Sequence, residues 1–406
     1  MVVADVKSGD ILALANYPFF NPNIYGKTSA SDRRNRAALD IYEPGSTLKP
    51  ILFAAALEEA VIEPDTLVDC ENGRWRVGRK TIRDHHRARW LPARKVLRYS
   101  SNIGSAKIAR DLGADAYYSY LVKLGLTEKP SVRLPAMRSG MLRPPSEWTE
   151  VDQAAIAFGQ GIGTTALQLA QAFMCIASGG ETRPLRLVKD PESPAPKPGV
   201  RVFSRQTAQT VLKLMEEVVE MDGTGRRARI PGITMAGKTG TAQKAGPGGY
   251  GDKYMSSFVG MVPSLDPELL ILCMVDEPKG IDYGGIVAAP VAREVFVETL
   301  ALRGKLPDAQ AASALADAET VDEVNPEALP QQAALPAPKV IEPGKRVPDV
   351  KGLPLRRALD ILLKKGIVPV IEGDGMTVTG QRPAPGAPWP EPAEEAEDDV
   401  FILQLS

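Results

Sequence analysis

The segment EPGSTLKP, residues 43–50, restricts the local fold more than any other stretch of this 406-residue chain. Pro50 has no backbone N–H to donate to the carbonyl oxygen of Ser46, so Ser46 is expected in the first helical turn, where that bond is dispensable. The apolar residues 51–60 predict that the helix continues. Lys49 then lies one turn from Ser46 on the same side. Alone, such a pair is more often a helix cap beside a solvated lysine.

Two later segments carry chemically similar side chains. RYSSNIGSAKIA places Ser100, Ser101 and Asn102 directly before an apolar helix, which by itself is a good N-cap. AGKTGTAQ is predicted to be a strand, and its small and polar residues are Lys238, Thr239, Gly240 and Thr241. We expect the missing side chain of Gly240 to let a ligand approach the backbone. S-x-x-K, S-D-N and K-T-G motifs in this order are the signature of penicillin-binding proteins and class A β-lactamases.

The charge and the cysteines exclude several classes of protein. Acids outnumber bases after residue 305 and bases outnumber acids before it, which suits an anionic substrate but is also typical of a solvated surface. Cys70, Cys175 and Cys273 are too scattered for a disulfide framework or a metal site, and the last two lie in apolar runs that predict buried thiols. The longest apolar run, residues 269–275, is too short for a membrane helix.

Composition divides the chain into three parts. Residues 1–305 mix strand and helix periods, and their start, MVVADVKSGDILALAN, predicts two strands joined by a KSGD turn. Residues 306–345 are rich in Ala, Pro and acids and read as a linker. Residues 346–406 predict a small strand–helix–strand module with leucines 355, 359, 362 and 363 on one stripe, the strand IVPVI, an acidic loop EPAEEAEDD and a final strand.

A nucleotide site is a weaker hypothesis. GITMAGKT, residues 232–239, fits the P-loop pattern, and LLILCMVDE, residues 269–277, resembles a strand that ends in magnesium ligands. A P-loop must be followed at once by a helix whose N-terminus faces the phosphates, but the next residues are GTAQKAGPGGYGD, which no helix tolerates. GQGIG, residues 159–163, lacks the full dinucleotide-binding spacing.

Several longer stretches, among them SGDILALANYPFFNPN, DCENGRWRVG, AFGQGIGTTALQLAQAF and YGGIVAAPVAREVF, resemble the class B penicillin-binding proteins, the peptidoglycan D,D-transpeptidases of division and wall growth. The resemblance covers about residues 1–300. It implies an α/β (α+β) transpeptidase fold, with an antiparallel sheet flanked by helices and a helical subdomain. VPDVKGLPLRRAL resembles a PASTA domain, a muropeptide- or partner-binding β-α-β module. The expected membrane anchor and pedestal domain are missing, so the chain reads as an N-terminally truncated piece.

The resemblance also implies roles for the motif residues. Ser46 is the expected nucleophile toward the carbonyl between two terminal D-alanines, and Lys49 is its base. Ser100 would relay a proton and Asn102 would hold the substrate amide and Lys49. Backbone N–H groups of Ser46 and Thr241 would bind the oxyanion. The terminal carboxylate would be bound by Lys238, Thr239 and Thr241, with Gly240 between them. Ser101 replaces the Asp of S-D-N, a position that the family tolerates.

Acyl transfer by a serine requires a base, and a lysine qualifies only when its pKa is lowered. The pKa of Lys49 must fall by about three units, which costs about 4 kcal/mol. Burial and a second ammonium both act in that direction, and the resemblance assigns the second ammonium to Lys238. His85 and His86 lie in a polar stretch without a triad setting.

Other readings stay open. A serine β-lactamase needs a carboxylate that activates water, and Glu147, Glu150 and Asp152 are its candidates. A non-catalytic wall sensor acting through the PASTA module is another reading. The basic GTGRRARIPG, residues 223–232, lines the cleft or is solvated, and Trp75 and Trp90 are core or acceptor contacts.

The family resemblance also implies ligands, partners and a location. We expect stem peptides as substrates, β-lactams as covalent inhibitors, a membrane glycosyltransferase and division proteins as partners, and a periplasmic location. We expect no cofactor, no metal and no nucleic acid.

Overall fold

The computed structural model divides the chain into two compact units, residues 1–322 and 323–406, which are described separately. The described residues are 1–20, 26–132, 134–188, 199–220, 222–246, 249–306, 347–353, 358, 361–362, 369–372, 377–387 and 401–405. The division falls inside the predicted linker, all of which except residue 306 lies outside the described residues. The predicted boundaries at residues 305 and 345 therefore stay predictions.

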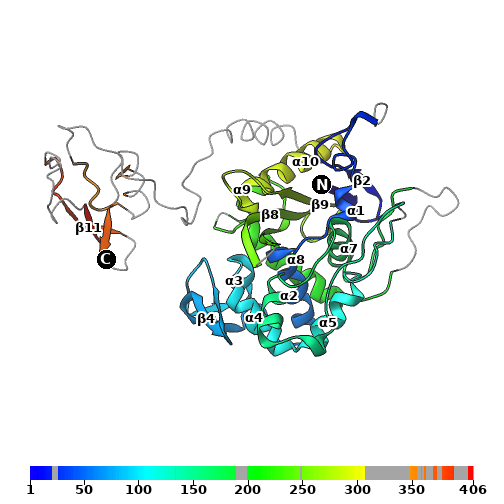
Figure 1. Cartoon of the computed structure of the whole chain (residues 1–406), viewed down its shortest axis with the longest axis horizontal. Helices are drawn as coiled ribbons and strands as arrows, with labels where there is room; N and C mark the ends of the chain where they lie inside the picture. Colours follow the sequence, from blue (N-terminus) through cyan, green and yellow to red (C-terminus); the bar gives the residue numbers. More distant parts are fainter. Residues whose placement is uncertain are drawn as a thin grey trace. The chain divides into compact units, whose positions relative to one another are not determined.

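Within the described part of the first unit, the central sheet is antiparallel and has five strands in the order β2-β1-β9-β8-β7 (Figure 1). Its strands are β1 (Val2–Asp5), β2 (Ile11–Leu14), β7 (Ala236–Gly246), β8 (Gly249–Val262) and β9 (Leu269–Asp276). Two small ribbons pair β3 (Leu67–Asp69) with β6 (Trp90–Pro92), and β4 (Arg74–Val77) with β5 (Lys80–Arg83). The predicted N-terminal hairpin is confirmed as β1 and β2.

Helices cover the sheet and build a separate helical part. They are α1 (Arg36–Leu39), α2 (Lys49–Glu58), α3 (Ala93–Arg98), α4 (Asn102–Leu112), α5 (Ala114–Lys123), α6 (Glu150–Ala157), α7 (Ala166–Ala177), α8 (Arg205–Val219), α9 (Gly284–Val287) and α10 (Ala289–Leu302). Helix α10 packs on β8 and β9, whereas α7 and α8 contact β9 and β7 from the other apolar core. The predicted sheet flanked by helices, with a helical subdomain, is therefore confirmed.

The long apolar run at residues 269–275 is explained by burial of β9 on both faces. Leu270 and Leu272 enter the core shared with α7 and α8. Leu269, Ile271 and Cys273 enter the core under α10. Because successive side chains of a strand point to opposite faces, a strand covered on both sides has no polar alternation.

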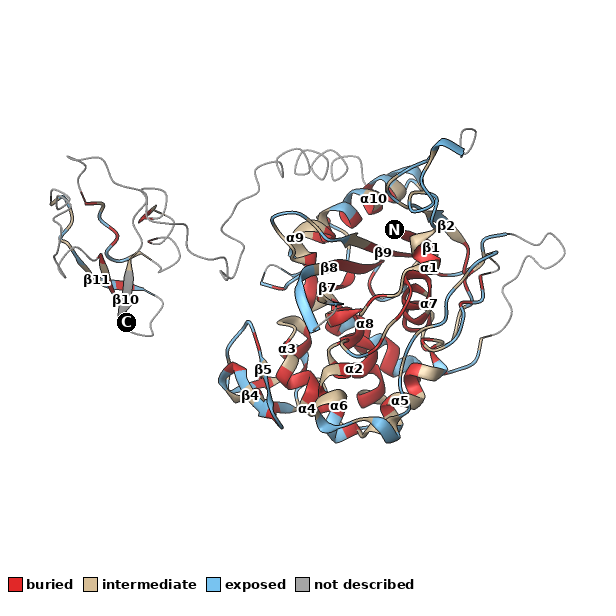
Figure 2. Ribbon diagram, in the orientation of Figure 1, coloured by how far each residue is buried: buried red, intermediate tan, exposed pale blue. Residues whose placement is uncertain are grey.

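Helix α2 is buried along nearly its whole length. Residues 49–56 are all buried, and Figure 2 shows α2 enclosed within the helical part. A helix that is apolar on every side belongs in a core rather than at a surface. The segment that carries Ser46 therefore leads directly into a helix held in the core.

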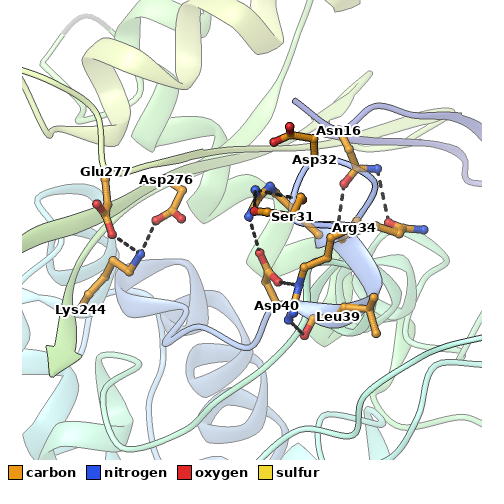
Figure 3. A network of polar contacts seen from close by, with 12 residues as sticks. Asn16, Ser31, Asp32, Arg34, Leu39, Asp40, Lys244, Asp276 and Glu277 are labelled. Atoms are coloured by element: carbon orange, nitrogen blue, oxygen red, sulfur yellow. Dashed lines mark hydrogen bonds and ion pairs between the residues drawn. The ribbon is translucent and has the colours of Figure 1, made fainter. Parts of the chain in front are cut away.

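Ion pairs join the ends of strands on the edge of the sheet. Lys244 Nζ lies 2.8 Å from Asp276 Oδ1 and 2.7 Å from Glu277 Oε1, which connects β7 to the end of β9 across β8 (Figure 3). Nearby, Asp40 pairs with Arg34 and also with Arg36, whose Nη1 lies 3.2 Å from the carboxylate. These pairs contribute little energy individually, and those of Asp40 join residues of the segment that precedes EPGSTLKP.

The second unit has a three-stranded sheet among its described residues. Strand β12 (Ile402–Leu405) runs parallel to β10 (Val370–Glu372) and antiparallel to β11 (Val378–Arg382). Leu362 of the predicted stripe is buried with Phe401 and Leu403. Leucines 355, 359 and 363 and the acidic loop lie outside the described residues. The strand β11 was not predicted, because VTGQR has almost no apolar pattern.

In the described part of the chain, no helix combines the length and apolar character that crossing a bilayer requires.

Candidate functional site

Ser46 lies in a 3-10 turn, Gly45–Leu48, that runs directly into α2. The backbone N–H of Lys49 donates to the carbonyl oxygen of Ser46, and Pro50 occupies the first turn of α2, as predicted. Ser46 is half-buried, and its side chain forms no helix cap. The hydroxyl thus stays free within the described structure for a reaction at the positive end of the helix.

Two glycines hold this turn against a neighbouring loop. Gly45 and Gly159 have φ values of +56° and +80°, and the N–H of Gly45 donates to the carbonyl oxygen of Gly159 at 3.0 Å. A Cβ on Gly159 would lie 2.1 Å from Gly45 O, so no side chain fits there. The Glu43 carboxylate accepts from Gly161 N–H at 2.7 Å and from the Tyr250 hydroxyl at 3.0 Å. The GQGIG segment therefore supports the nucleophile turn.

Lys49 points its ammonium at the second motif. Its Nζ lies 2.6 Å from the carbonyl oxygen of Ser100, 3.0 Å from Ser100 Oγ and 2.8 Å from Asn102 Oδ1. The side chain is fully buried at the N-terminus of α2. The structure thus brings together three of the predicted site residues, Lys49, Ser100 and Asn102, although more than 50 residues separate Lys49 from the other two in sequence.

The turn that holds Ser100 is strained and firmly capped. Ser100 has φ +59°, a left-handed conformation that costs a residue with a side chain about 1 kcal/mol. Ser101 caps α4 by accepting from Gly104 N–H at 2.9 Å, as the sequence pattern predicted. The carboxylate of Asp84 also binds this helix start, accepting from Asn102 N–H at 2.6 Å and Ile103 N–H at 3.0 Å.

The third motif lies on β7, the edge strand of the sheet, where it faces the nucleophile turn. Lys238 Nζ lies 3.0 Å from Ser100 Oγ and 3.0 Å from the carbonyl oxygen of Thr239. Lys238 is fully buried, like Lys49. One hydroxyl therefore joins the two lysines, and the three motifs form one connected cluster.

The prediction that the missing side chain of Gly240 leaves room for a ligand is wrong. A Cβ on Gly240 would lie 2.4 Å from Ser257 Oγ and 2.9 Å from Thr47 Cγ2. Protein atoms rather than a ligand occupy that side of the strand. Gly240 therefore allows β7 to approach the nucleophile turn closely, and in this way it contributes to the site indirectly.

The two threonines of β7 contact neighbouring segments. Thr239 Oγ1 donates to Thr224 Oγ1 at 2.9 Å, and Gly284 N–H donates to Thr241 Oγ1 at 3.1 Å. The first contact lies in GTGRRARIPG, which therefore borders the motif strand, although Arg226 in that segment is exposed. Alternate N–H groups of an edge strand point away from the sheet. Such groups on β7 can donate to a bound ligand.

Burial lowers the pKa of Lys49 to about 7, and the negative charge of Asp84 opposes this change. Burial also lowers the pKa of Lys238 well below its ordinary value, and the positive charge of Lys49 lowers it further. Among the described residues, the hydrogen-bond partners of the two ammonium groups are carbonyl, hydroxyl and amide oxygens. At neutral pH the pair therefore holds fewer than two protons, which is the condition for a lysine base.

The P-loop hypothesis is wrong. Lys238 lies inside the strand β7, which continues to Gly246 and pairs with β8. No helix follows Thr239 to face a phosphate. Residues 269–276 form the central strand β9 rather than a strand that ends beside a P-loop.

The acids considered for a β-lactamase lie away from the lysine cluster. Glu147 and Glu150 are exposed, and Asp152 caps α6 by accepting from Thr149 N–H at 2.9 Å while pairing with Arg143 at 2.7 Å. Only the opposite end of α6, next to Gly159, approaches the nucleophile turn. The first and last residues of α6 are seven positions apart, which is about 10 Å along the helix axis. None of these acids is positioned to activate water at Ser46.

The aromatic candidates have different surroundings. The His85 ring contacts the Tyr283 ring edge-on at 6.0 Å, and burial followed by the charge of Lys49 lowers the pKa of His85. His86 stacks on Tyr99 at 4.2 Å. Trp75 packs against the core, whereas Trp90 is exposed. His85 is thus close enough to Lys49 to respond to its charge, which the sequence did not indicate.

Sequence reasoning missed three residues of the site. Asp84 follows β5 in TIRDHHR, Gly159 belongs to GQGIG, and Glu43 precedes the serine by three positions. The three glycines of GQGIG were a visible signal, which was interpreted through nucleotide binding and the family resemblance rather than as support for the turn at Ser46. Asp84 and Glu43 act through contacts between distant segments, and no local pattern indicates such contacts.

Comparison with known proteins agrees with this geometry. The family model described as the penicillin binding protein transpeptidase domain matches residues 1–297, and the model described as the PASTA domain matches residues 345–391. The probable peptidoglycan D,D-transpeptidase PenA of Neisseria flavescens is 36% identical over 310 residues, which cover 76% of this chain and 76% of the relative.

Longer relatives and one solved structure match the same part of the chain. The peptidoglycan D,D-transpeptidase FtsI of Escherichia coli (strain K12) is 36% identical over 311 residues, which are 76% of this chain and 52% of the relative. PenA of Neisseria gonorrhoeae is 34% identical and also covered to 52%, so the chain spans about half the length of these two relatives. The apo transpeptidase domain of Burkholderia pseudomallei penicillin-binding protein 3 matches with a TM-score of 0.69 and 36% identity, covering 76% of this chain and 88% of that chain.

Proposed function

The chain belongs to the family of penicillin-binding protein transpeptidases and carries a PASTA domain, and from this premise we propose that it is a serine D,D-transpeptidase. Its substrates are peptidoglycan stem peptides that end in D-alanyl-D-alanine. The reaction joins two stem peptides through an acyl-enzyme on Ser46 and releases D-alanine. β-Lactams acylate the same serine.

The observation that carries this proposal is the convergence of two buried lysines on one serine hydroxyl. Lys49 and Lys238 both contact Ser100 Oγ at 3.0 Å, and Lys49 lies one turn after Ser46. A lysine with a pKa of about 7 is neutral often enough to accept a proton from a serine. An exposed helix cap beside a solvated lysine would not have these properties.

The proposed acylation assigns one role to each of these groups. Ser46 Oγ attacks the carbonyl carbon between the two D-alanines and passes its proton to neutral Lys49. The oxyanion is stabilised by backbone N–H groups of Ser46 and of Thr241 on the edge strand. Ser100 Oγ, which contacts Lys49, then passes a proton to the departing amine, so the C–N bond breaks and D-alanine leaves.

Deacylation uses the same groups in the reverse direction. The amine of a second stem peptide attacks the ester carbon, gives its proton through Ser100 to Lys49, and expels Ser46 Oγ, which regains a proton. Lys238, Thr239 and Thr241 hold the terminal carboxylate of the first substrate, because the bound anion raises the pKa of Lys238 and favours its charged form, and the two hydroxyls donate to the anion. Asn102 orients both Lys49 and the substrate amide.

This function also implies a location and partners. We place the reaction at the extracytoplasmic face of the bacterial cell membrane, where stem peptides lie. A membrane glycosyltransferase that makes the glycan strands and proteins of the division machinery are the proposed partners. The alternative of a non-catalytic wall sensor does not explain two buried lysines with lowered pKa values, because a sensor has no use for a neutral amine.

Intact-mass measurement after incubation with benzylpenicillin tests the proposal. We expect one covalent adduct per chain, on the peptide that contains Ser46. The absence of an adduct on a folded protein, or an adduct on a different residue, would overturn it.

A further inference from the structure

Asp84 is a buried carboxylate that the mechanism above leaves unused. It follows strand β5 and is 9% exposed. Its Oδ1 accepts from the N–H groups of Asn102 at 2.6 Å and Ile103 at 3.0 Å, and its Oδ2 accepts from the Ser101 hydroxyl. Ser101 already caps this helix, so the carboxylate of Asp84 adds a second, long-range attachment to the same turn.

Among the described residues, every hydrogen-bond acceptor of the Lys49 ammonium belongs to the turn that Asp84 binds. Lys49 donates to the carbonyl oxygen and hydroxyl of Ser100 and to the side chain of Asn102. Ser100 is held in a left-handed conformation, φ +59°, which the isolated segment would leave readily. Asp84 binds the three residues that follow Ser100. The position of the Lys49 acceptors therefore depends on this carboxylate.

Asp84 also brings the negative charge that acts on Lys49. The charged and titratable groups that face Lys49 are Lys238, His85 and Asp84, while Ser100 and Asn102 are neutral. Asp84 raises the pKa of Lys49, in opposition to burial. Without the charge of Asp84, burial would lower the pKa of Lys49 further, and the amine would then be a weaker base.

We propose that Asp84 is a positioning residue of the acyl transfer, which holds the Ser100–Asn102 turn and supplies the negative charge that keeps Lys49 an effective base. This inference rests on the proposed reaction at Ser46. Asp84 does not touch the substrate. It acts through the turn and through Lys49.

Two substitutions separate the two effects. Asp84→Asn keeps an oxygen that accepts from the backbone N–H groups and an amide that donates to Ser101, but it removes the charge. The pH at which acylation is half-maximal should therefore move down by roughly one unit. Asp84→Ala removes the contacts as well, so the acylation rate should fall at least tenfold, as an order-of-magnitude estimate for a misplaced catalytic group, at every pH.

Asp69→Asn is the matched control. Asp69 Oδ1 also accepts a backbone N–H, that of Glu71 at 2.9 Å, and lies in the same part of the chain. It does not contact the Ser100–Asn102 turn and does not influence the pKa of Lys49. This variant should acylate at the wild-type rate, and the pH of half-maximal acylation should be unchanged.

The experiment measures second-order acylation by a fluorescent penicillin between pH 5 and 9, with a thermal melt for each variant. Failure of the wild type to acylate would overturn the proposed function itself. If the wild type acylates, an unchanged midpoint in Asp84→Asn overturns the inference about Asp84, and so does Asp84→Ala at the wild-type rate. Should Asp84→Ala not fold, the midpoint of Asp84→Asn still decides.

Discussion

Lys49 and Lys238 direct their ammonium groups at the same atom, and each Nζ lies 3.0 Å from Ser100 Oγ. Two charged ammonium groups at one buried oxygen repel each other, so the loss of one proton relieves the repulsion. The hydroxyl can then accept a hydrogen bond from the charged amine and donate one to the neutral amine. This arrangement provides a short path for a proton between Lys49 and a group that leaves or enters near Ser100.

Replacement of Ser46 by Ala or of Lys49 by Arg should abolish acylation. Ser46→Ala has no nucleophile, and the guanidinium of Lys49→Arg stays charged and cannot accept a proton. Covalent labelling by a fluorescent penicillin measures the effect, and a thermal melt shows whether the fold persists. Lys244→Arg, on the same edge strand but outside the cluster, should label normally. Clear labelling of Ser46→Ala would contradict the assignment of the nucleophile.

The stability of the protein relative to Lys49→Met should increase with pH. The pKa of Lys49 is lowered from 10.5 to about 7 by folding. Between these values the unfolded chain binds more protons than the folded protein, so raising the pH favours the folded state. A lowering of this size corresponds to a loss of about 4–5 kcal/mol in the free energy of unfolding at low pH. Lys49→Met does not have this loss, because its side chain does not titrate.

Melting temperatures at pH 7 and pH 10 measure this change. The melting temperature of the wild type minus that of Lys49→Met should be more positive at pH 10 than at pH 7. Effects of titrating groups that Lys49 does not influence cancel in the difference, whereas Lys238 and His85, whose pKa values the charge of Lys49 lowers, also contribute to it. A difference that does not vary with pH would show that Lys49 titrates normally.

Gly159→Ala should damage the site more than Gly161→Ala. The two glycines have nearly the same positive φ, +80° and +78°, so alanine strains the backbone about equally at both positions. At Gly159 the new Cβ would lie 2.1 Å from Gly45 O, whereas at Gly161 the nearest atom is Ile156 Cγ1 at 3.5 Å. Displacement of the nucleophile turn in Gly159→Ala should reduce acylation by about tenfold or more.

The comparison of these two variants includes its own control. Both should lose a similar amount of stability from backbone strain, which a melt measures. Equal acylation rates at equal stability would mean that the contact between Gly159 and Gly45 does not position Ser46.

The penicillin adduct should persist for many minutes or longer. Hydrolysis needs a carboxylate that activates water beside the ester. The oxygen Oε1 of Glu43 accepts from Gly161 N–H and the Tyr250 hydroxyl, and its Oε2, which has no protein partner among the described residues, is buried from solvent. Asp84 accepts from three groups of the α4 start. Intact mass over time after removal of excess penicillin measures the lifetime. Loss of the adduct within seconds, with steady hydrolysis of a chromogenic cephalosporin, would favour a β-lactamase.

Much of the fold could be predicted because its signals are local. The strand period of MVVADV and the apolar run at residues 269–275 indicated β1 and β9, and Pro50 located the start of α2. The polar strand β11 has no such period, and it forms because β12 offers hydrogen-bonding partners. Which strands pair could not be predicted from periods alone.

In the candidate site, too, local signals could be predicted and long-range contacts could not. Residue type and order predicted Ser46, Lys49 and Lys238, since the chemistry of each is carried by its own side chain. The roles of Asp84 and Gly240 depend on segments far away in sequence. Gly240 was interpreted wrongly for that reason, because a missing side chain indicates that space is needed but does not indicate what fills it.

The pairing of β1 with β9 has a consequence for synthesis of the chain. Val2 pairs with Leu272 and Asp5 with Leu269, so the first strand waits for a partner made almost 270 residues later. At a translation rate of about 5–20 residues per second, that delay is roughly ten to fifty seconds. Until then the nascent hairpin exposes an apolar strand edge, which can pair with other chains. Newly made protein should therefore depend on holding chaperones, and slowing the ribosome before β9 should increase aggregation rather than improve folding.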